Sequence, residues 1–100
     1  MKTESEISQY MENINIPVHM RTGILDYVMN GVETGHFLKA LFSNDLAETY
    51  ARADGENTLK IKEYVTLMYN ALPAGCWGSE SNYKEWVKRK GLNGMVKALV

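Results

Sequence analysis

The sequence predicts an all-α fold, a compact bundle of about six short helices that forms one domain over residues 1–100. Apolar residues recur three or four positions apart in successive segments, which is the spacing of one helix face. Proline is scarce, with only two residues, and helix-capping residues and glycines separate the apolar segments. With 45% hydrophobic and 23% charged residues, the chain has the composition of an ordinary globular domain, long enough for one core.

Two helices are expected in the first third of the chain. Thr3 and Glu6 have the spacing of a capping box, so the first helix should begin there and end within residues 13–16. Pro17 should lie in the first turn of the second helix, which Asn30-Gly31 should end in a left-handed cap. Their apolar faces consist of Ile7, Tyr10 and Met11, then Met20, Ile24, Tyr27 and Val28.

Two short helices are expected in the middle of the chain. Thr34-Gly35 should open the first of them, and Ser43-Asn44-Asp45 should break the chain and cap the second. Asp54-Gly55 should end the second. Their apolar sides consist of Phe37, Leu38, Leu41 and Phe42, then Leu46, Tyr50 and Ala53.

The last third contains the clearest helical pattern, over residues 61–72, which outweighs a brief strand-like alternation at 59–62. Pro73 should end this helix, and residues 73–79 should be non-helical. Ser79 should start a helix that Gly91 closes. The inward residues of these helices are Ile61, Tyr64, Val65, Met68 and Leu72, then Tyr83, Trp86 and Val87; Met95, Ala98 and Leu99 suggest a short tail helix.

Targeting signals and disulfide bonds are not expected. No apolar run approaches the roughly 18 to 20 residues that span a bilayer, and residues 1–6 contain no apolar signal region. Cys76 is the only cysteine, so no disulfide can form within the chain. These features predict a cytoplasmic protein that makes no membrane contact.

The sequence contains no pattern typical of a catalytic or metal site. A nucleophilic cysteine needs a histidine base, and although His19 and His36 are present, Gly75-Cys76-Trp77-Gly78 matches no cysteine-protease signature. We expect Cys76 and Trp77 to pack this turn against the bundle. Asp54-Gly55-Glu56-Asn57 lacks the alternating acidic positions of a calcium loop, and zinc spacings are missing. The sequence therefore predicts a protein that is not an enzyme and holds no cofactor or metal.

Charge is distributed unevenly along the chain. Residues 1–57 carry a net charge of −5 and residues 58–100 carry +4. A carboxylate-rich surface on a small rigid bundle can occupy a basic groove that otherwise holds nucleic acid, because it offers the same sign of charge. A merely solvated face also accounts for these carboxylates. The acidic residues near the short helices are Asp45, Glu48, Asp54 and Glu56, with Glu33 and Asp26 further back.

A helix-turn-helix is an alternative interpretation, with a helix over Pro17–Asn30, a turn over Gly31–Gly35 and a recognition helix from His36. That recognition helix would offer only His36 and Lys39 to a groove, and phosphates would repel the acidic half of the chain. Direct nucleic-acid binding is therefore not expected there. The basic cluster of Lys84, Lys88, Arg89 and Lys90 could contact nucleic acid or be a solvated face.

An ordered set of short motifs over residues 16–79 resembles a widespread group of small proteins encoded in phages and prophages. The motifs are Ile16-Pro17; Tyr27, Val28 and Gly31; Gly35, Phe37 and Leu38; Asn44-Asp45-Leu46; Arg52-Ala53-Asp54; Tyr69, Asn70 and Pro73; and Cys76-Trp77-Gly78-Ser79. With its size and acidic half, the chain is similar to anti-CRISPR proteins, including inhibitors of type I surveillance complexes.

The resemblance implies a phage-derived, non-enzymatic inhibitor in the cytoplasm of the host bacterium. Its partner would be a Cas protein of a crRNA-guided complex, held by stoichiometric binding that blocks target DNA. The expected partner-binding residues are Asn44, Asp45, Glu48, Tyr50, Asp54 and Glu56. The alternatives are a small phage DNA-binding or regulatory protein and a phage assembly protein that self-associates.

Overall fold

The computed structural model describes residues 2–94, and every regular element in that range is a helix, which confirms the all-α prediction. Residues 91–94 form a further helical turn, and the expected tail helix at Met95, Ala98 and Leu99 lies outside the described residues. The elements are α1 (Glu4–Asn13), α2 (Val18–Asn30), α3 (His36–Phe42), α4 (Leu46–Arg52), α5 (Gly55–Thr58), α6 (Ile61–Ala71), the 3-10 turn η1 (Ala74–Cys76) and α7 (Glu80–Lys88).

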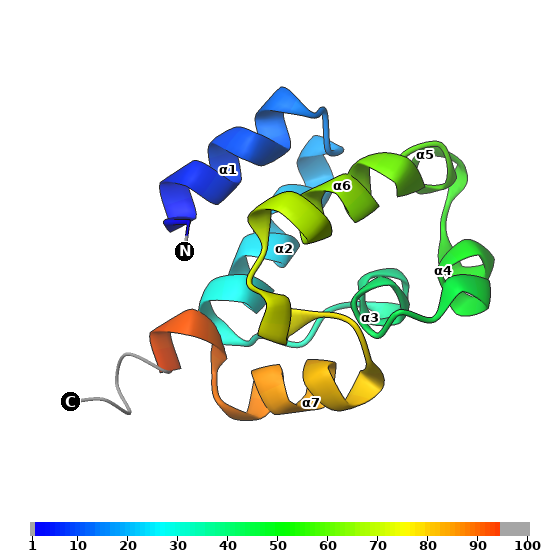
Figure 1. The fold of residues 1–100 in the computed structure, drawn as a ribbon. Coiled ribbons are helices and arrows are strands. Elements are labelled where there is room, and N and C mark those ends of the chain that lie inside the picture. The colour runs from blue at the N-terminus through cyan, green and yellow to red at the C-terminus, as the bar shows by residue number, and fades with distance from the viewer. Residues whose placement is uncertain (1, 95–100) are drawn as a thin grey trace.

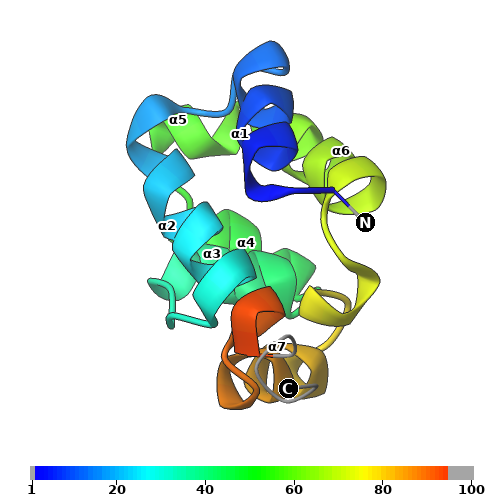
Figure 2. The same ribbon diagram turned by 90° about the vertical axis from the view of Figure 1, so that its left-hand side faces the viewer.

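The helices form two packed groups joined by α2. Helix α1 packs against α2 and α6, while α3 packs against α4 and α7, and η1 lies on α7. Figures 1 and 2 show α1 and α6 at one end of the bundle and α7 at the other, with α2 running between them. This arrangement brings α7 beside α3, although more than thirty residues separate the two helices in the chain.

Most helix boundaries follow the local capping signals. Thr3 and Glu6 form the expected capping box, Gly31 ends α2 in the left-handed conformation, and Ser79 accepts a hydrogen bond from the backbone of Asn82. Three boundaries differ from the expectation. Pro17 is the residue that caps α2 rather than a member of its first turn, and Asp54 starts the additional helix α5. Helix α7 ends at Lys88, and Gly91 begins the helical turn that follows instead of closing α7.

The core is organised around Tyr27 of α2, which is fully buried. Its ring stacks between those of Phe42 and Tyr83, with ring centres 4.7 and 5.0 Å away. Its hydroxyl donates a hydrogen bond to the carbonyl oxygen of Cys76 at 2.6 Å. The indole nitrogen of Trp86 donates to the carbonyl oxygen of Tyr27 at 3.0 Å. These contacts connect α2 to α3, α7 and the turn at η1.

Three side chains predicted on inward faces are exposed, which corrects the sequence-based core. Leu46 and Tyr50 of α4 are 70% and 51% exposed, and Val65 of α6 is 46% exposed. Only Thr49 of α4 is buried, because α4 touches the bundle along a narrow line. The buried face of α6 is centred about a quarter turn away from Val65, on Tyr64, Leu67, Met68 and Ala71.

Residues 73–79 also differ in part from the expectation. They contain the 3-10 turn η1, in which Cys76 is fully buried as predicted. Trp77 is only half-buried, so part of its side chain remains on the surface of this turn. The backbone nitrogen of Gly78 donates to the carbonyl oxygen of Phe42 at 2.8 Å and ties the turn to α3.

Candidate partner-binding surface

The link between α3 and α4 fixes the position of Asp45. Asn44 has a φ of 61°, a left-handed conformation that asparagine tolerates better than most residues, so the chain reverses after Phe42. Asp45 then caps α4, and its Oδ1 accepts a hydrogen bond from the backbone nitrogen of Glu48 at 3.1 Å. Buried Thr49 donates from its hydroxyl to the carbonyl oxygen of Asp45 at 2.6 Å. The carboxylates of this link are therefore exposed but held on an ordered backbone.

Asp54 is held in the same way at the start of α5. Its Oδ1 accepts from the backbone nitrogen of Asn57 at 2.7 Å. Asn57 is buried and accepts, through Oδ1, a hydrogen bond from the Tyr64 hydroxyl at 2.6 Å. Burial, followed by the nearby Asp54 and Glu56 charges, raises the pKa of Tyr64, so the hydroxyl stays protonated and remains a donor. This chain of contacts connects the exposed Asp54 carboxylate to the core.

Two adjoining hollows run along this side of the molecule. One, of about 250 Å³, contains Asp45 and Glu48 from α4, Glu80 from α7, and Lys39 and His36 from α3. The other, of about 400 Å³, lies between α2 and α3 and contains His19, His36 and Asp54 over a floor that includes Met20, Phe37 and Leu38. Because His36 lines both hollows, they form one continuous surface. Glu56 lines neither hollow, but it pairs with His19, which lines the second. We call the carboxylates Asp45, Glu48, Asp54, Glu56 and Glu80 the acidic surface.

Three ion pairs modulate the charge of the acidic surface. Glu48 pairs with Arg52 at 3.1 Å, Glu80 with Lys84 at 2.8 Å, and Glu56 with His19 at 3.4 Å. The hydrogen bond from Lys84, reinforced by its charge, lowers the pKa of Glu80. All three pairs are exposed, so each stabilises the fold only slightly and its carboxylate stays accessible to a partner.

The structure brings together only part of the predicted site. Asp45 and Glu48 share one hollow, and Asp54 lies in the adjoining one. Tyr50 is exposed but lies about 200° around α4 from Glu48, because the two residues are two positions apart. Asn44 lines a small groove between α4 and α6 instead. Glu80 is an addition that the sequence did not indicate, because only the packing of α3 on α7 places it beside α4.

Helix α3 has little surface to offer as a recognition helix. Five of its seven residues, all apolar, are buried, which leaves only His36 and Lys39 exposed. The helix-turn-helix alternative therefore gains no support from the placement of α3. In the basic cluster, the Arg89 guanidinium lies over the Trp86 ring at 5.2 Å, while Lys84 is engaged with Glu80.

Cys76 is in no state to act as a nucleophile at neutral pH. Burial raises the pKa of its thiol to about 12, so the thiolate is not populated. The ordinary pKa of a cysteine thiol is about 9, so below pH 9 the thiol is neutral in both the folded and the unfolded chain. Above pH 9 the unfolded chain loses this proton, whereas the folded chain retains it. Stability from this group is therefore present below pH 9 and is lost as the pH rises towards 12.

We expect the free energy of unfolding to fall by up to about 1.4 kcal/mol per pH unit between pH 9 and 11 from this group. Urea unfolding followed by circular dichroism should show a smaller alkaline loss for Cys76→Ala than for the wild type. An identical pH slope for the two proteins would contradict a buried, protonated thiol. Tyr64, whose pKa is also raised by burial, would contribute equally to both slopes, because Cys76 is not among the groups that act on it.

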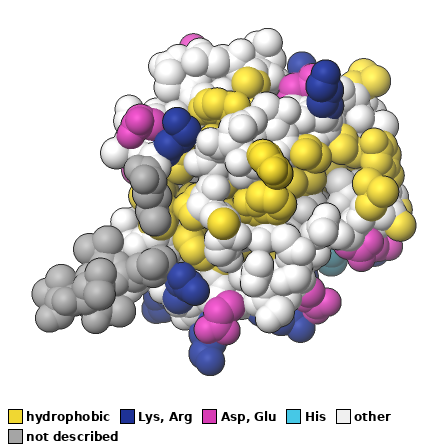
Figure 3. All heavy atoms as spheres, viewed as in Figure 1, with side chains coloured by type: hydrophobic (Ala, Val, Ile, Leu, Met, Phe, Trp, Pro, Cys, Tyr) yellow, Lys and Arg dark blue, Asp and Glu magenta, His cyan; other side chains and the backbone are white. Residues whose placement is uncertain are grey.

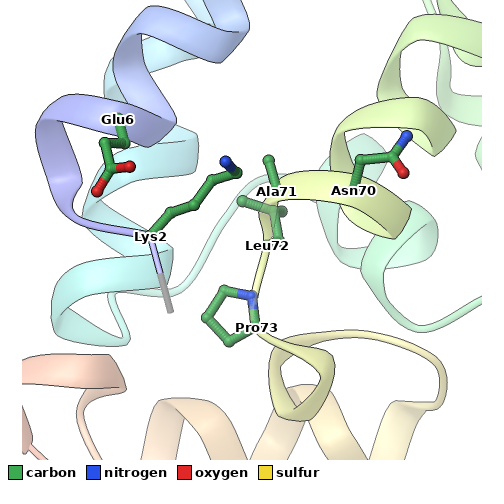
Figure 4. Close-up of a pocket in the computed structure, with 6 residues that line it drawn as sticks. All are labelled: Lys2, Glu6, Asn70, Ala71, Leu72 and Pro73. Carbon is green, nitrogen blue, oxygen red and sulfur yellow. The ribbon is translucent and has the colours of Figure 1, made fainter.

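A third hollow, of about 430 Å³, lies between the start of α1 and the end of α6. Figure 4 shows Lys2 reaching across it towards Ala71 and Leu72, while Glu6 and Asn70 point away from its centre. The Glu6 carboxylate already accepts a hydrogen bond from the backbone of Thr3, which lowers its pKa. The polar groups of this hollow do not converge, so it forms no site for chemistry.

Within residues 2–94, no group of three or more His, Cys, Asp or Glu side chains is placed to hold a metal ion. No helix in the same range is long and apolar enough to cross a membrane. The candidate site is described by the charge and the shape of its two hollows.

Comparisons with known proteins leave the family open. No family model, no curated protein and no solved structure matches this chain. The resemblance to phage-encoded proteins therefore rests on the sequence motifs alone. Several of the motif residues have structural roles, since Gly31 caps α2, Asp45 and Asp54 cap α4 and α5, and Ser79 caps α7.

Proposed function

We propose that this chain is a phage-derived, non-enzymatic inhibitor that binds a crRNA-guided surveillance complex of the host and blocks its access to target DNA. The observation that carries the proposal is the acidic surface, with Asp45, Glu48 and Glu80 from two different helices around one hollow. A partner groove built to hold phosphates presents lysine and arginine, and carboxylates on a fixed backbone match that charge.

The way in which these carboxylates are held supports binding by a preformed surface. Asp45 caps α4 and Asp54 caps α5. Buried Thr49 holds the backbone of Asp45, and buried Asn57 connects Asp54 to Tyr64 in the core. Little conformational freedom of the backbone would be lost on binding, which favours affinity. Lys39 is the only lysine or arginine that lines the hollow with Asp45, Glu48 and Glu80, so this hollow remains predominantly acidic.

The proposal is tested by mixing the purified protein with a panel of purified type I surveillance complexes and analysing the mixtures by size-exclusion chromatography and calorimetry. We expect one complex to retain the protein at a fixed stoichiometry, with affinity that falls as salt rises. Binding to none of them would contradict the proposal. Retention by bare duplex DNA instead would favour a DNA-binding function.

A further inference from the structure

A contiguous apolar face remains exposed on the opposite flank of α4 from Glu48. Leu46 of α4 and Val65 and Tyr69 of α6 are 70%, 46% and 77% exposed. Figure 3 shows a band of hydrophobic side chains that crosses this face from the middle of the molecule towards α4, with acidic side chains beside its end. We call Leu46, Val65, Tyr69 and the half-buried Trp77 the apolar face.

The apolar face contains a shallow groove between α4 and α6. Its volume is about 60 Å³, which suits the end of one aliphatic side chain. Leu46 and Val65 form its two rims, over a floor that includes Leu41, Ile61 and Met68. Tyr69 follows Val65 by one helical turn, and its ring centre lies 6.3 Å from that of Trp77. The face therefore continues from α4 along α6 to the turn before α7.

The charge beside the groove selects the kind of partner. Asp45 is the only charged residue among those that line the groove, and the same residue lines the acidic hollow with Glu48 and Glu80. Lys62 is also exposed on α6, but it does not line the groove. A partner with an apolar stripe would fill the groove, and a lysine or arginine along the edge of that stripe on the α4 side would pair with Asp45.

The size of the apolar face suits a single amphipathic helix. Leu46, Val65 and Tyr69 together expose about 400 Å², the size of a functional patch on a monomer. A standard interface buries about 800 Å² on each partner, of which a little more than half is apolar, so this face is of the size that one binding partner covers. One amphipathic helix, which places two or three apolar side chains on one face, covers the available surface.

We propose that the groove between α4 and α6 binds an amphipathic helix of the protein partner, with its apolar stripe on Leu46, Val65 and Tyr69 and a lysine or arginine directed at Asp45. This inference rests on the proposed binding function and names the part of the partner that is recognised. The groove can be tested on the isolated chain without a surveillance complex. A failure of this test is therefore distinguishable from a failure of the proposed function.

The test uses two designed helical peptides with the same apolar stripe, one with arginines and one with glutamates along the edge. Titration into the isotopically labelled protein, followed by amide chemical shifts, gives the affinity and the binding surface. We expect the arginine peptide to shift amides around Leu46, Val65 and Tyr69 and to bind at least tenfold more tightly than the glutamate peptide. Val65→Ser with Tyr69→Ser should weaken its binding at least tenfold.

The matched control is Val18→Ser with Leu59→Ser, which also removes two exposed apolar side chains, 74% and 82% exposed, neither of which lines the groove. This control should bind the arginine peptide as the wild type does. Equal binding of both peptides, shifts outside the apolar face, or no binding would overturn the inference. Self-association that Val65→Ser with Tyr69→Ser abolishes would also overturn it, because a second copy would then cover the face.

Discussion

Gly31→Ala is expected to lower the free energy of unfolding by about 3 kcal/mol or more, because a side chain there would combine backbone strain with a close backbone contact. Gly31 ends α2 with a φ of 66°, where a side chain is strained. A Cβ atom there would also lie 2.8 Å from the Gly91 nitrogen and 2.9 Å from the Trp86 carbonyl oxygen. These contacts are backbone atoms of α7 and of the segment that follows it, so a rotamer change cannot relieve them.

Urea unfolding monitored by circular dichroism measures this effect, with Gly55→Ala as the matched control. A Cβ atom at Gly55 meets no atom within 4 Å, and its φ is not positive. That substitution should change the free energy of unfolding by less than about 1 kcal/mol. If both variants unfolded at the same urea concentration, the close approach of Gly31 to Gly91 would not exist.

Neutralising the hollow with Asp45→Asn, Glu48→Gln and Glu80→Gln is expected to weaken binding to the surveillance complex by about 100-fold, because several charge pairs across the interface are lost together. Asparagine caps a helix as well as aspartate does, so α4 should remain folded. Asp45→Lys would be a poorer test, because it would remove the hydrogen bond that caps α4 together with the negative charge.

The control for this variant is Glu4→Gln, Glu12→Gln and Glu85→Gln, which removes the same number of charges from exposed positions outside the acidic surface. It should retain wild-type affinity. Both triple variants should unfold at similar urea concentrations, since exposed ion pairs contribute little to stability. Equal loss of affinity in the two variants would show that overall charge, and not this surface, drives binding.

The parts of the fold that the sequence predicts are those that depend on residues close together in the chain. The capping box at Thr3, the left-handed end of α2 at Gly31 and the caps at Asp45 and Ser79 depend on residues within one turn of each other. Helix α5 was missed because Asp54-Gly55 indicates a helix end as readily as a start. The contact that settles it, between Asn57 and Tyr64, joins side chains seven residues apart.

The site was less predictable because it depends on packing between distant helices. Asp45 and Glu48 are visible as an acidic cluster in the sequence, but the addition of Glu80 requires α7 to lie beside α3. Leu46 and Val65 fit helical apolar patterns and were expected in the core. Their exposure follows from how α4 and α6 are rotated about their axes, which the spacing of residues does not fix.

Competition with target DNA tests the central claim most directly. A purified surveillance complex that binds the protein would be titrated with labelled target duplex in the presence of wild-type protein or of the Asp45→Asn, Glu48→Gln, Glu80→Gln variant. We predict that the wild type raises the apparent dissociation constant of the duplex in proportion to its concentration and that the variant does so about 100-fold less effectively. Binding of the wild type without any displacement of the duplex would contradict the account.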